Sequence, residues 1–285
     1  MQMGEPTIDH IELSFPTLPS ELEGLRIVHI SDLHVHHRAR RFDRLAEKLA
    51  ALPCDLAMFT GDYMTFSHHE QAAVQVMAQL VDAVQPRHGR FGIFGNHDSP
   101  EIKPLLQNLP IQWLNNDAAR HPELPLDLLG VDTTEDRVSD PFRALTRAME
   151  EDYRAYPMSS RCERVRTPAK ASADPQRWRI LLSHIPNLLP IASDMGVGLM
   201  LSGHTHGGQI RLPGIGPVYN STDLPLAFTS GILRYGDTLC AVTRGLGEVH
   251  LTFRMFCPRQ LPIYTLRRGR SRGNSQPVMQ CVERW

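Results

Sequence analysis

Five short clusters of this sequence combine aspartate, histidine and asparagine, the side chains that bind divalent transition metals. The clusters are Asp32-x-His34, Gly61-Asp62, Gly95-Asn96-His97-Asp98, Ser183-His184 and Gly203-His204-Thr205-His206. Mixed ligation of this kind suits manganese, iron or zinc better than calcium or magnesium. We therefore expect a site that depends on a transition metal.

A pair of metal ions is the arrangement that this ligand set fits. Two divalent cations a few ångströms apart repel each other strongly, so they need an anionic bridge between them. Asp32 and His34 can bind one ion together, and Asp62 can bridge both ions. The other expected ligands are Asn96 and His184 for the second ion, and His204 and His206, one for each ion.

Each cluster follows a run of apolar residues that predicts a buried strand. These runs are residues 25–30, 55–60, 89–94, 179–182 and 197–201. Apolar residues at helical spacing follow two of the clusters, at residues 41–51 and 70–84. In folds that alternate strands with helices, ligands collect at the carboxyl ends of the strands, so we expect the clusters to converge there.

Further strands predict that a second sheet closes the fold. Apolar and polar residues alternate in residues 11–15, and short β-rich segments follow residue 226, including residues 238–243 and 248–253. The expected fold class is α/β (α+β), with a two-sheet β-sandwich flanked by helices.

The chain is expected to form a single domain over residues 1–266. Residues 152–176 are polar with few large apolar side chains, which predicts a surface excursion. Residues 267–285 place several arginines among glycine and serine, which predicts a disordered basic tail.

Composition narrows the classes of partner. Lys plus Arg is 30 and Asp plus Glu is 31, so no overall basic field is available to bind nucleic acid. The five cysteines form no C-x-x-C pair, which argues against a disulfide framework and a thiolate zinc site. Residues 1–19 contain no apolar run long enough for a signal peptide or membrane span. We expect a cytoplasmic protein, with peripheral contact at the inner face of the membrane left open.

The five clusters stand in the order of the motifs of the calcineurin-like metallophosphoesterase superfamily, which the sequence resembles over about residues 25–265. Gly207-Gly208-Gln209-Ile210 and Arg244-Gly245-Leu246-Gly247 resemble its YkuE-like bacterial phosphodiesterase branch. The protein phosphatases of the superfamily carry an acidic residue at the position that Thr65 occupies in this sequence. The departure argues against a phosphoprotein phosphatase.

The resemblance implies two divalent metal ions, with manganese expected and iron or zinc as alternatives. One ion is implied at Asp32, His34, Asp62 and His206, and the other at Asp62, Asn96, His184 and His204. The implied nucleophile is a hydroxide that bridges the metals, and no covalent enzyme intermediate is expected. His97 is implied beside the phosphate, as a hydrogen-bond donor or as the acid for the leaving group.

Other residues near the clusters have open roles. Asp98 is a candidate to orient an imidazole, with a local turn or cap role as the alternative. His36, His68 and Arg211 are candidates for contact with the substrate, although solvated side chains are the commoner case.

The expected function is hydrolysis of a phosphoester bond, as a phosphodiesterase that acts on a small or lipid-linked substrate. One alternative is a pyrophosphohydrolase of a lipid-linked nucleotide sugar of the UDP-2,3-diacylglucosamine type, as in some relatives of the branch. A nuclease is a second alternative, disfavoured by the neutral charge balance. A non-catalytic scaffold is a third, and it would be expected to have lost metal ligands.

Overall fold

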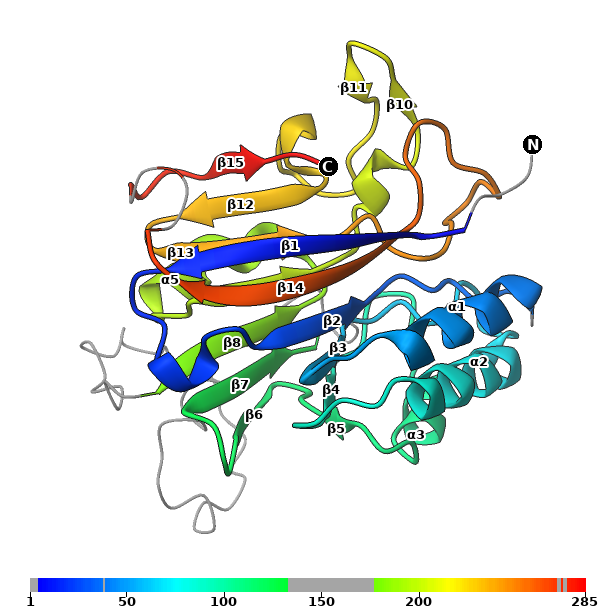
Figure 1. Ribbon diagram of the computed structural model, residues 1–285. Helices are drawn as coiled ribbons and strands as arrows, with labels where there is room; N and C mark the ends of the chain where they lie inside the picture. The colour runs from blue at the N-terminus through cyan, green and yellow to red at the C-terminus, as the bar shows by residue number, and fades with distance from the viewer. Residues whose placement is uncertain (1–4, 38, 133–176, 271–272, 274–275) are drawn as a thin grey trace, which may run out of the picture.

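The computed structural model describes residues 5–37, 39–132, 177–270, 273 and 276–285. Two β-sheets lie against each other, and helices α1, α2 and α3 cover the outer face of the first sheet (Figure 1). The predicted excursion at residues 152–176 lies outside the described residues. The predicted class, a two-sheet sandwich with flanking helices, is confirmed.

The first sheet has six strands and carries three of the five clusters. Its order is β1 (Thr7–Phe15), β14 (Gln260–Arg268), β2 (Arg26–Ile30), β3 (Leu56–Phe59), β4 (Arg90–Gly92) and β5 (Gln112–Trp113). Strands β2, β3 and β4 are parallel neighbours. Their carboxyl ends therefore meet at one edge, where the loops after them lie side by side.

The second sheet has seven strands and carries the other two clusters. Its order is β15 (Gln280–Glu283), β12 (Gly231–Tyr235), β13 (Thr238–Val242), β9 (Leu199–Ser202), β8 (Trp178–Ser183), β7 (Leu126–Val131) and β6 (Asp117–Arg120). Strands β7, β8, β9 and β13 run parallel. The loops after β8 and β9 thus also leave the sheet at a common edge.

Helices bury their apolar stripes on the outer faces. Helices α1 (Arg40–Ala51), α2 (Glu70–Ala83) and α3 (Ile102–Leu106) pack on the first sheet, and α5 (Leu189–Asp194) packs on the second. Phe42, Leu45 and Leu49 of α1 lie three to four residues apart and are buried, as the helical period requires. The predicted helices at residues 41–51 and 70–84 are confirmed within one residue at each end.

The inner faces of the two sheets form the central core. Ile27 and Met58 of the first sheet are buried in one cluster with Leu128, Ile180 and Leu201 of the second. Burial of this apolar layer holds the two carboxyl edges together, because each buried aliphatic side chain contributes roughly 1.5–3 kcal/mol.

Short elements connect the larger ones. The 3-10 helices are η1 (Ser20–Leu22), η2 (Pro186–Leu188), η3 (His206–Gly208) and η4 (Leu226–Phe228). Strands β10 (Arg211–Leu212) and β11 (Gly216–Pro217) form a hairpin that projects at the top of Figure 1.

The predicted strand at residues 248–253 is wrong. The segment is a loop whose backbone groups bond to one side chain instead of to a neighbouring strand. Gln209 donates to the carbonyls of Val249 and Leu251, and its side-chain oxygen accepts the Val249 N–H. Buried Glu248 fixes the start of the loop by pairing with arginines.

The chain end also differs from the expectation of a disordered tail from residue 267. Strand β14 continues to Arg268, and β15 (Gln280–Glu283) pairs with β12 at the edge of the second sheet. Val282 and Trp285 pack against the central core. The composition of the segment did not predict strand β15, because two apolar side chains are enough to dock a short edge strand on an existing sheet.

Candidate metal centre

All seven predicted metal ligands lie in loops that leave the carboxyl ends of strands. Strands β2, β3 and β4 of the first sheet precede Asp32, Asp62 and Asn96, and β8 and β9 of the second precede His184 and His204. Backbone hydrogen bonds join these loops, including Asp32 N–H to Gly61 O and Gly203 N–H to His184 O at 3.0 Å each. The clusters therefore converge where the two sheets meet.

Several of these residues adopt left-handed backbone conformations that non-glycine residues rarely use. Asp32, His34, Asp62, His204 and His206 have φ values of 52°, 42°, 56°, 68° and 51°. Each such residue costs on the order of 1–3 kcal/mol, which the surrounding fold must offset. Backbone strain at several residues with metal-binding side chains is typical of a functional site.

Glycines allow the loops to approach closely enough for the side chains to meet. A Cβ at Gly61 would collide with the backbone of Gly95, and one at Gly95 would collide with Asp62. A Cβ at Gly203 would collide with the Asp32 carboxylate. The Gly-Asp, Gly-Asn and Gly-His pairs of the sequence are thus a packing requirement of the site.

Asp32, His34 and His206 form the first ligand group, with ligand atoms within 4.8 Å of one another. His34 Nε2 lies 3.0 Å from His206 Nε2, and Asp32 Oδ1 lies 3.5 Å from His206 Nε2. All three side chains are buried.

Asp62, His184 and His204 form the second ligand group, and their ligand atoms also lie within 4.8 Å of one another. His184 Nε2 lies 3.1 Å from Asp62 Oδ2, and the rings of His184 and His204 lie edge to face at 5.1 Å. Burial and His184 lower the pKa of His204 to about 4, which keeps this imidazole neutral and able to bind a cation.

Asp62 faces both groups. Its Oδ2 lies 3.1 Å from His184 Nε2 and 3.4 Å from His34 Nε2. Its other oxygen accepts the backbone N–H of His97 at 2.9 Å, which fixes the carboxylate plane. A single carboxylate oxygen between two imidazole groups is the geometry that a shared ligand requires.

Two buried polar atoms in the centre make no well-aligned hydrogen bond with the described residues, although the second lies 3.1 Å from Asp62 Oδ2, and both fit a cation. They are Asp32 Oδ2 and His184 Nε2. His184 Nδ1 donates to the Thr60 carbonyl at 2.6 Å, so Nε2 of the neutral ring carries a lone pair. Although burial opposes a charge, Asp62 and Asp32 raise the pKa of His184 to about 9, so a metal ion that binds Nε2 would displace a proton from it. The donor set therefore fits two divalent cations.

His97 lies at the rim of the centre. Its Nδ1 donates to the Thr65 carbonyl at 3.3 Å, and its ring meets that of His34 edge to face at 5.0 Å. Nε2 is consequently the nitrogen that can serve a substrate. Asn96, the neighbouring predicted ligand, is exposed in the same loop.

Asp98 holds the loop backbone, and its candidate catalytic role is not supported by its contacts. The carboxylate accepts the N–H groups of Asp62, Tyr63 and Gly95 at 2.8–2.9 Å. Burial, together with the Asp62 charge, raises the pKa of Asp98 to about 7. Of the two roles left open by the sequence, the local backbone role is the one that the geometry fits.

The three candidates for substrate contact occupy different places. His36 Nε2 lies 3.2 Å from Thr65 Oγ1, at the edge of the first ligand group. His68 is exposed and stacks on Phe66, farther along the same loop. Arg211 donates to the carbonyl of Trp285, and its contact with the substrate stays a prediction.

Two residues that contact the centre were not predicted as part of it. The Thr65 hydroxyl lies 3.3 Å from His34 Nδ1, although the sequence showed Thr65 only as a missing acid. The buried guanidinium of Arg254 lies 3.2 Å from His206 Nδ1 and donates to the carbonyls of His206 and Arg244. No motif marks Arg254, which directly follows the segment predicted as a strand, residues 248–253.

Comparison with known proteins identifies a family. The sequence profile described as calcineurin-like phosphoesterase matches residues 25–208 of this chain. The matched region contains both ligand groups.

Individual relatives are distant and extend along most of the chain. The metallophosphoesterase YkuE of Bacillus subtilis is 27% identical over 256 residues, which cover 88% of this chain and 82% of that protein. Phosphodiesterase YaeI of Escherichia coli is 26% identical, covering 79% of this chain and 76% of that protein. UDP-2,3-diacylglucosamine pyrophosphatase LpxG of Chlamydia trachomatis is 23% identical, covering 72% of this chain and 70% of that protein.

Among the described residues, none of the helices has the length and apolar character needed to cross a membrane.

Proposed function

This chain belongs to the calcineurin-like phosphoesterase family of metal-dependent phosphoester hydrolases, and we propose that it is a phosphodiesterase. The observation that carries the proposal is the position of Asp62, whose Oδ2 faces His34 of one ligand group and His184 of the other. Similarity to a protein named phosphodiesterase supports the choice of bond.

The ligand groups would hold two divalent ions, with manganese proposed first and iron or zinc as alternatives. Asp32, His34 and His206 would bind one ion, His184 and His204 the other, and Asp62 both. The family resemblance adds Asn96 to the second ion. Such ions lower the pKa of a bound water and polarise a phosphoryl oxygen.

The protein's own contribution is to hold the ligands and the proton donor in place before the substrate arrives. The Thr60 carbonyl fixes the tautomer of His184, and the Thr65 carbonyl fixes that of His97. With Nδ1 committed to a carbonyl, His97 would use Nε2 to donate to the phosphoryl oxygen or the leaving group.

Thr65 supports a diester over a phosphoprotein substrate. Protein phosphatases of the family place an acidic side chain at this position, where this chain has a buried hydroxyl between His34 and His36. The hydroxyl adds no negative charge beside His97.

Hydrolysis of bis-p-nitrophenyl phosphate after loading with manganese tests the proposal. We expect turnover that a chelator removes, and a loss of about 1000-fold or more in kcat for Asp62→Asn, because the amide lacks the shared charge. Asp82→Asn, an exposed change in α2, should retain full activity. A manganese-loaded enzyme that cleaves p-nitrophenyl phosphate but no diester would contradict the proposed bond specificity.

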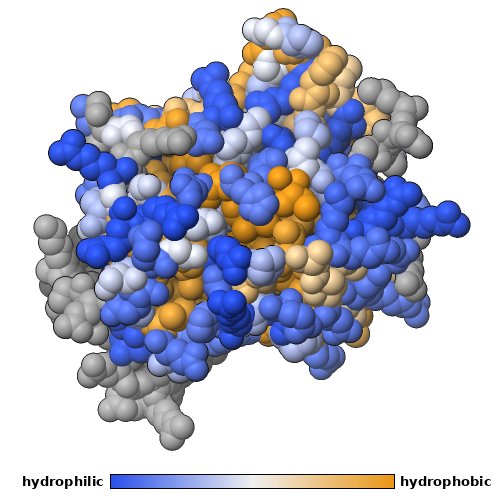
Figure 2. All heavy atoms as spheres, in the orientation of Figure 1, coloured by the Kyte–Doolittle hydropathy of each residue, from blue (hydrophilic) through white to orange (hydrophobic). Residues whose placement is uncertain are grey.

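A lipid-linked diphosphate is the second candidate substrate, favoured by an exposed apolar surface near the centre. Eight of the eleven large hydrophobic side chains exposed in the described residues lie in the segments 212–226 and 251–256. They are Leu212, Ile215, Val218, Tyr219, Leu226, Leu251, Phe253 and Phe256. Hydrophobic side chains are visible on the projecting hairpin at the top of Figure 2.

This apolar surface adjoins the second ligand group. His204 Nε2 lies 3.4 Å from the carbonyl of Ser221, inside the segment that carries five of the eight side chains. Ile210 and Met255 form a bridge that joins the two segments. An acyl chain can rest on such a surface while its phosphate reaches the centre.

Activity on a diacyl pyrophosphate in mixed micelles separates the two candidates. If the substrate is lipid-linked, Ile215→Asp should raise KM for the micellar substrate about tenfold, because a charge replaces a side chain that is 75% exposed. The same variant should leave hydrolysis of bis-p-nitrophenyl phosphate unchanged. Equal KM values for wild type and variant on micelles would remove the lipid-linked candidate.

A further inference from the structure

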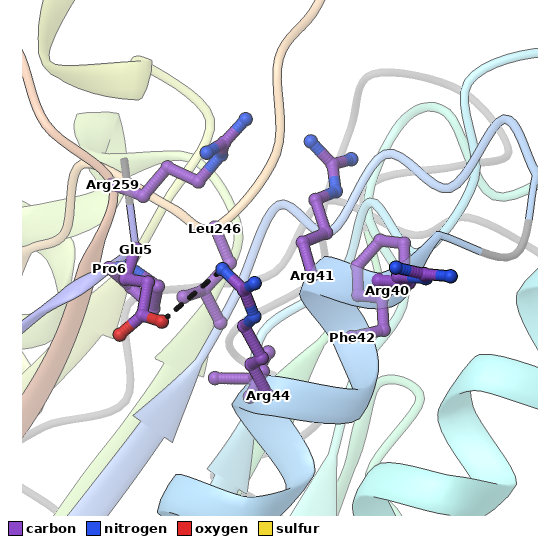
Figure 3. Close-up of a pocket in the computed structure, with 9 residues that line it drawn as sticks. Glu5, Pro6, Arg40, Arg41, Phe42, Arg44, Leu246 and Arg259 are labelled. Atoms are coloured by element: carbon purple, nitrogen blue, oxygen red, sulfur yellow. Dashed lines mark hydrogen bonds and ion pairs between the residues drawn. The ribbon is translucent and has the colours of Figure 1, made fainter. Parts of the chain in front are cut away.

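A cavity of about 150 Å³ opens beside the N-terminal turns of α1, away from the two ligand groups. Four arginines and one glutamate line it over an apolar floor. The lining residues are Glu5, Pro6, Arg40, Arg41, Phe42, Arg44, Leu45, Leu246 and Arg259. Arg41 and Arg44 extend from α1 and Arg259 from the opposite wall, with the Arg44–Glu5 ion pair at the side (Figure 3).

Positive charge exceeds negative charge in and around this cavity. Glu248 lies 2.6 Å from both Arg41 and Arg259, and it also lies 3.6 Å from Arg254. One carboxylate thus contacts three guanidinium groups, all of them largely buried. Like charges gathered in a poorly solvated place are costly unless an anion joins them.

Two properties of the arginine side chains agree with this energetic cost. Burial lowers the pKa of Arg259, and Arg41 and Arg254 lower it further, while Glu248 opposes the change. Arg41 Nε is buried with no acceptor among the described residues. The unbonded Nε leaves Arg41 with a donor that an anion can accept.

The helix itself adds to the positive potential. Ala39 precedes α1 and provides no side-chain cap, and the Phe42 N–H donates to the Ala39 carbonyl at 2.9 Å. Arginine is unfavourable in a first turn, where the helix dipole is positive, yet Arg40 and Arg41 lie there beside Asp43, and Arg44 follows in the next turn. The excess of arginine side chains, and not the helix end, is the reason to expect a bound anion.

A second cavity has Arg41 and His36 in its lining. It has a volume of about 300 Å³, and it shares Arg41 with the first cavity. Its lining residues are His36, His37, Ala39, Arg41, Glu248 and Thr252. His36 contacts Thr65, which contacts the ligand His34.

We propose that the arginine-lined cavity is a phosphoryl-binding site, separate from the metal centre, formed by Arg41, Arg44 and Arg259. A phosphate fits because its three or four oxygens can accept from several guanidinium groups at once. The occupant is either free phosphate or a second phosphate of the substrate. Only the latter rests on the proposed phosphodiesterase function.

Binding of inorganic phosphate to the metal-depleted protein tests the site. Titration calorimetry at constant ionic strength, with chloride as the reference anion, should show one phosphate site. Arg44→Gln, a change at a side chain that is 62% exposed, should weaken binding about fivefold, and Arg41→Gln about tenfold or more. Arg87→Gln, a control at another exposed arginine, should bind like the wild type. Absence of binding, or equal affinity in all four proteins, would overturn the proposal.

Kinetics then identify the source of the phosphate. If the substrate supplies it, Arg44→Gln should raise KM about fivefold for a diester that carries a second phosphate, and leave KM for bis-p-nitrophenyl phosphate unchanged. Unchanged KM for both, with weakened phosphate binding, assigns the cavity to free phosphate. Because the calorimetry uses no turnover, failure of the phosphodiesterase proposal would not affect its result.

Discussion

Thr65 is a single residue on which three histidines of the centre converge. Its hydroxyl lies 3.3 Å from His34 Nδ1 and 3.2 Å from His36 Nε2, and its carbonyl accepts from His97 Nδ1. It is buried and is not one of the proposed metal ligands, so we assign it the role of a positioning residue. Groups that orient metal-binding imidazoles influence metal affinity and activity by roughly 10–100-fold.

Removal of the Thr65 hydroxyl should therefore weaken the centre without unfolding the protein. Thr65→Val keeps the shape, and we expect manganese affinity and kcat to fall about tenfold each, because His34 loses its partner. Thr65→Ser should restore most of both. Metal titration and kinetics measure the two effects, and a valine variant with wild-type manganese affinity would exclude the positioning role.

At the residue scale, the sequence predicts the metal ligands better than the residues that hold the ligands in position. Histidine and aspartate after apolar runs are visible as types and spacings, which is why His34, Asp62 and His184 were identified. The roles of Asp98 and Arg254 depend on which backbone groups lie nearby after folding, since both bond to N–H or carbonyl groups of distant loops. No residue type encodes that proximity.

At the scale of elements, the centre depends on how closely the loops after β3 and β4 approach. Gly61 has a φ of +95°, and a Cβ there would collide with Gly95 N and Cα. The collision is with backbone, so no side-chain rotation relieves it.

Gly61→Ala should consequently destabilise the fold by at least about 3 kcal/mol, from steric overlap together with left-handed strain. Gly214→Ala is the matched control, because Gly214 also has a positive φ, +75°, but nothing lies within 4 Å of its added Cβ. We expect the control to cost only about 1 kcal/mol. Chemical denaturation measures both, and equal losses would show that backbone strain, rather than loop contact, explains the glycine.

Element prediction succeeded where burial imposes a period and failed where a side chain replaces a strand. The helices α1 and α2 and the strands before each cluster follow from apolar spacing. Residues 248–253 carry the same alternation, but Gln209 satisfies their backbone groups, so they remain a loop. Local pattern contains no information about a glutamine some forty residues away in sequence.

At the scale of the molecule, the two sheets hold the halves of the centre, and the end of the chain adds an edge strand to one of them. Deletion of residues 276–285 would remove β15 and the contacts of Val282 and Trp285 with the core. We expect a loss of roughly 2 kcal/mol, or about 4 °C in the thermal midpoint. Val278→Ser, at a side chain 59% exposed, should change little. An unchanged midpoint after deletion would mean that the tail does not stabilise the sheet.

The central claim is that side chains from both sheets hold two cations around one carboxylate. Anomalous diffraction from manganese-soaked crystals, collected at the manganese edge, tests it most directly. We predict two peaks about 3.5–4 Å apart, one beside Asp32, His34 and His206 and one beside His184 and His204, with Asp62 Oδ2 between them. A single peak, or two peaks that do not share Asp62, would contradict the account.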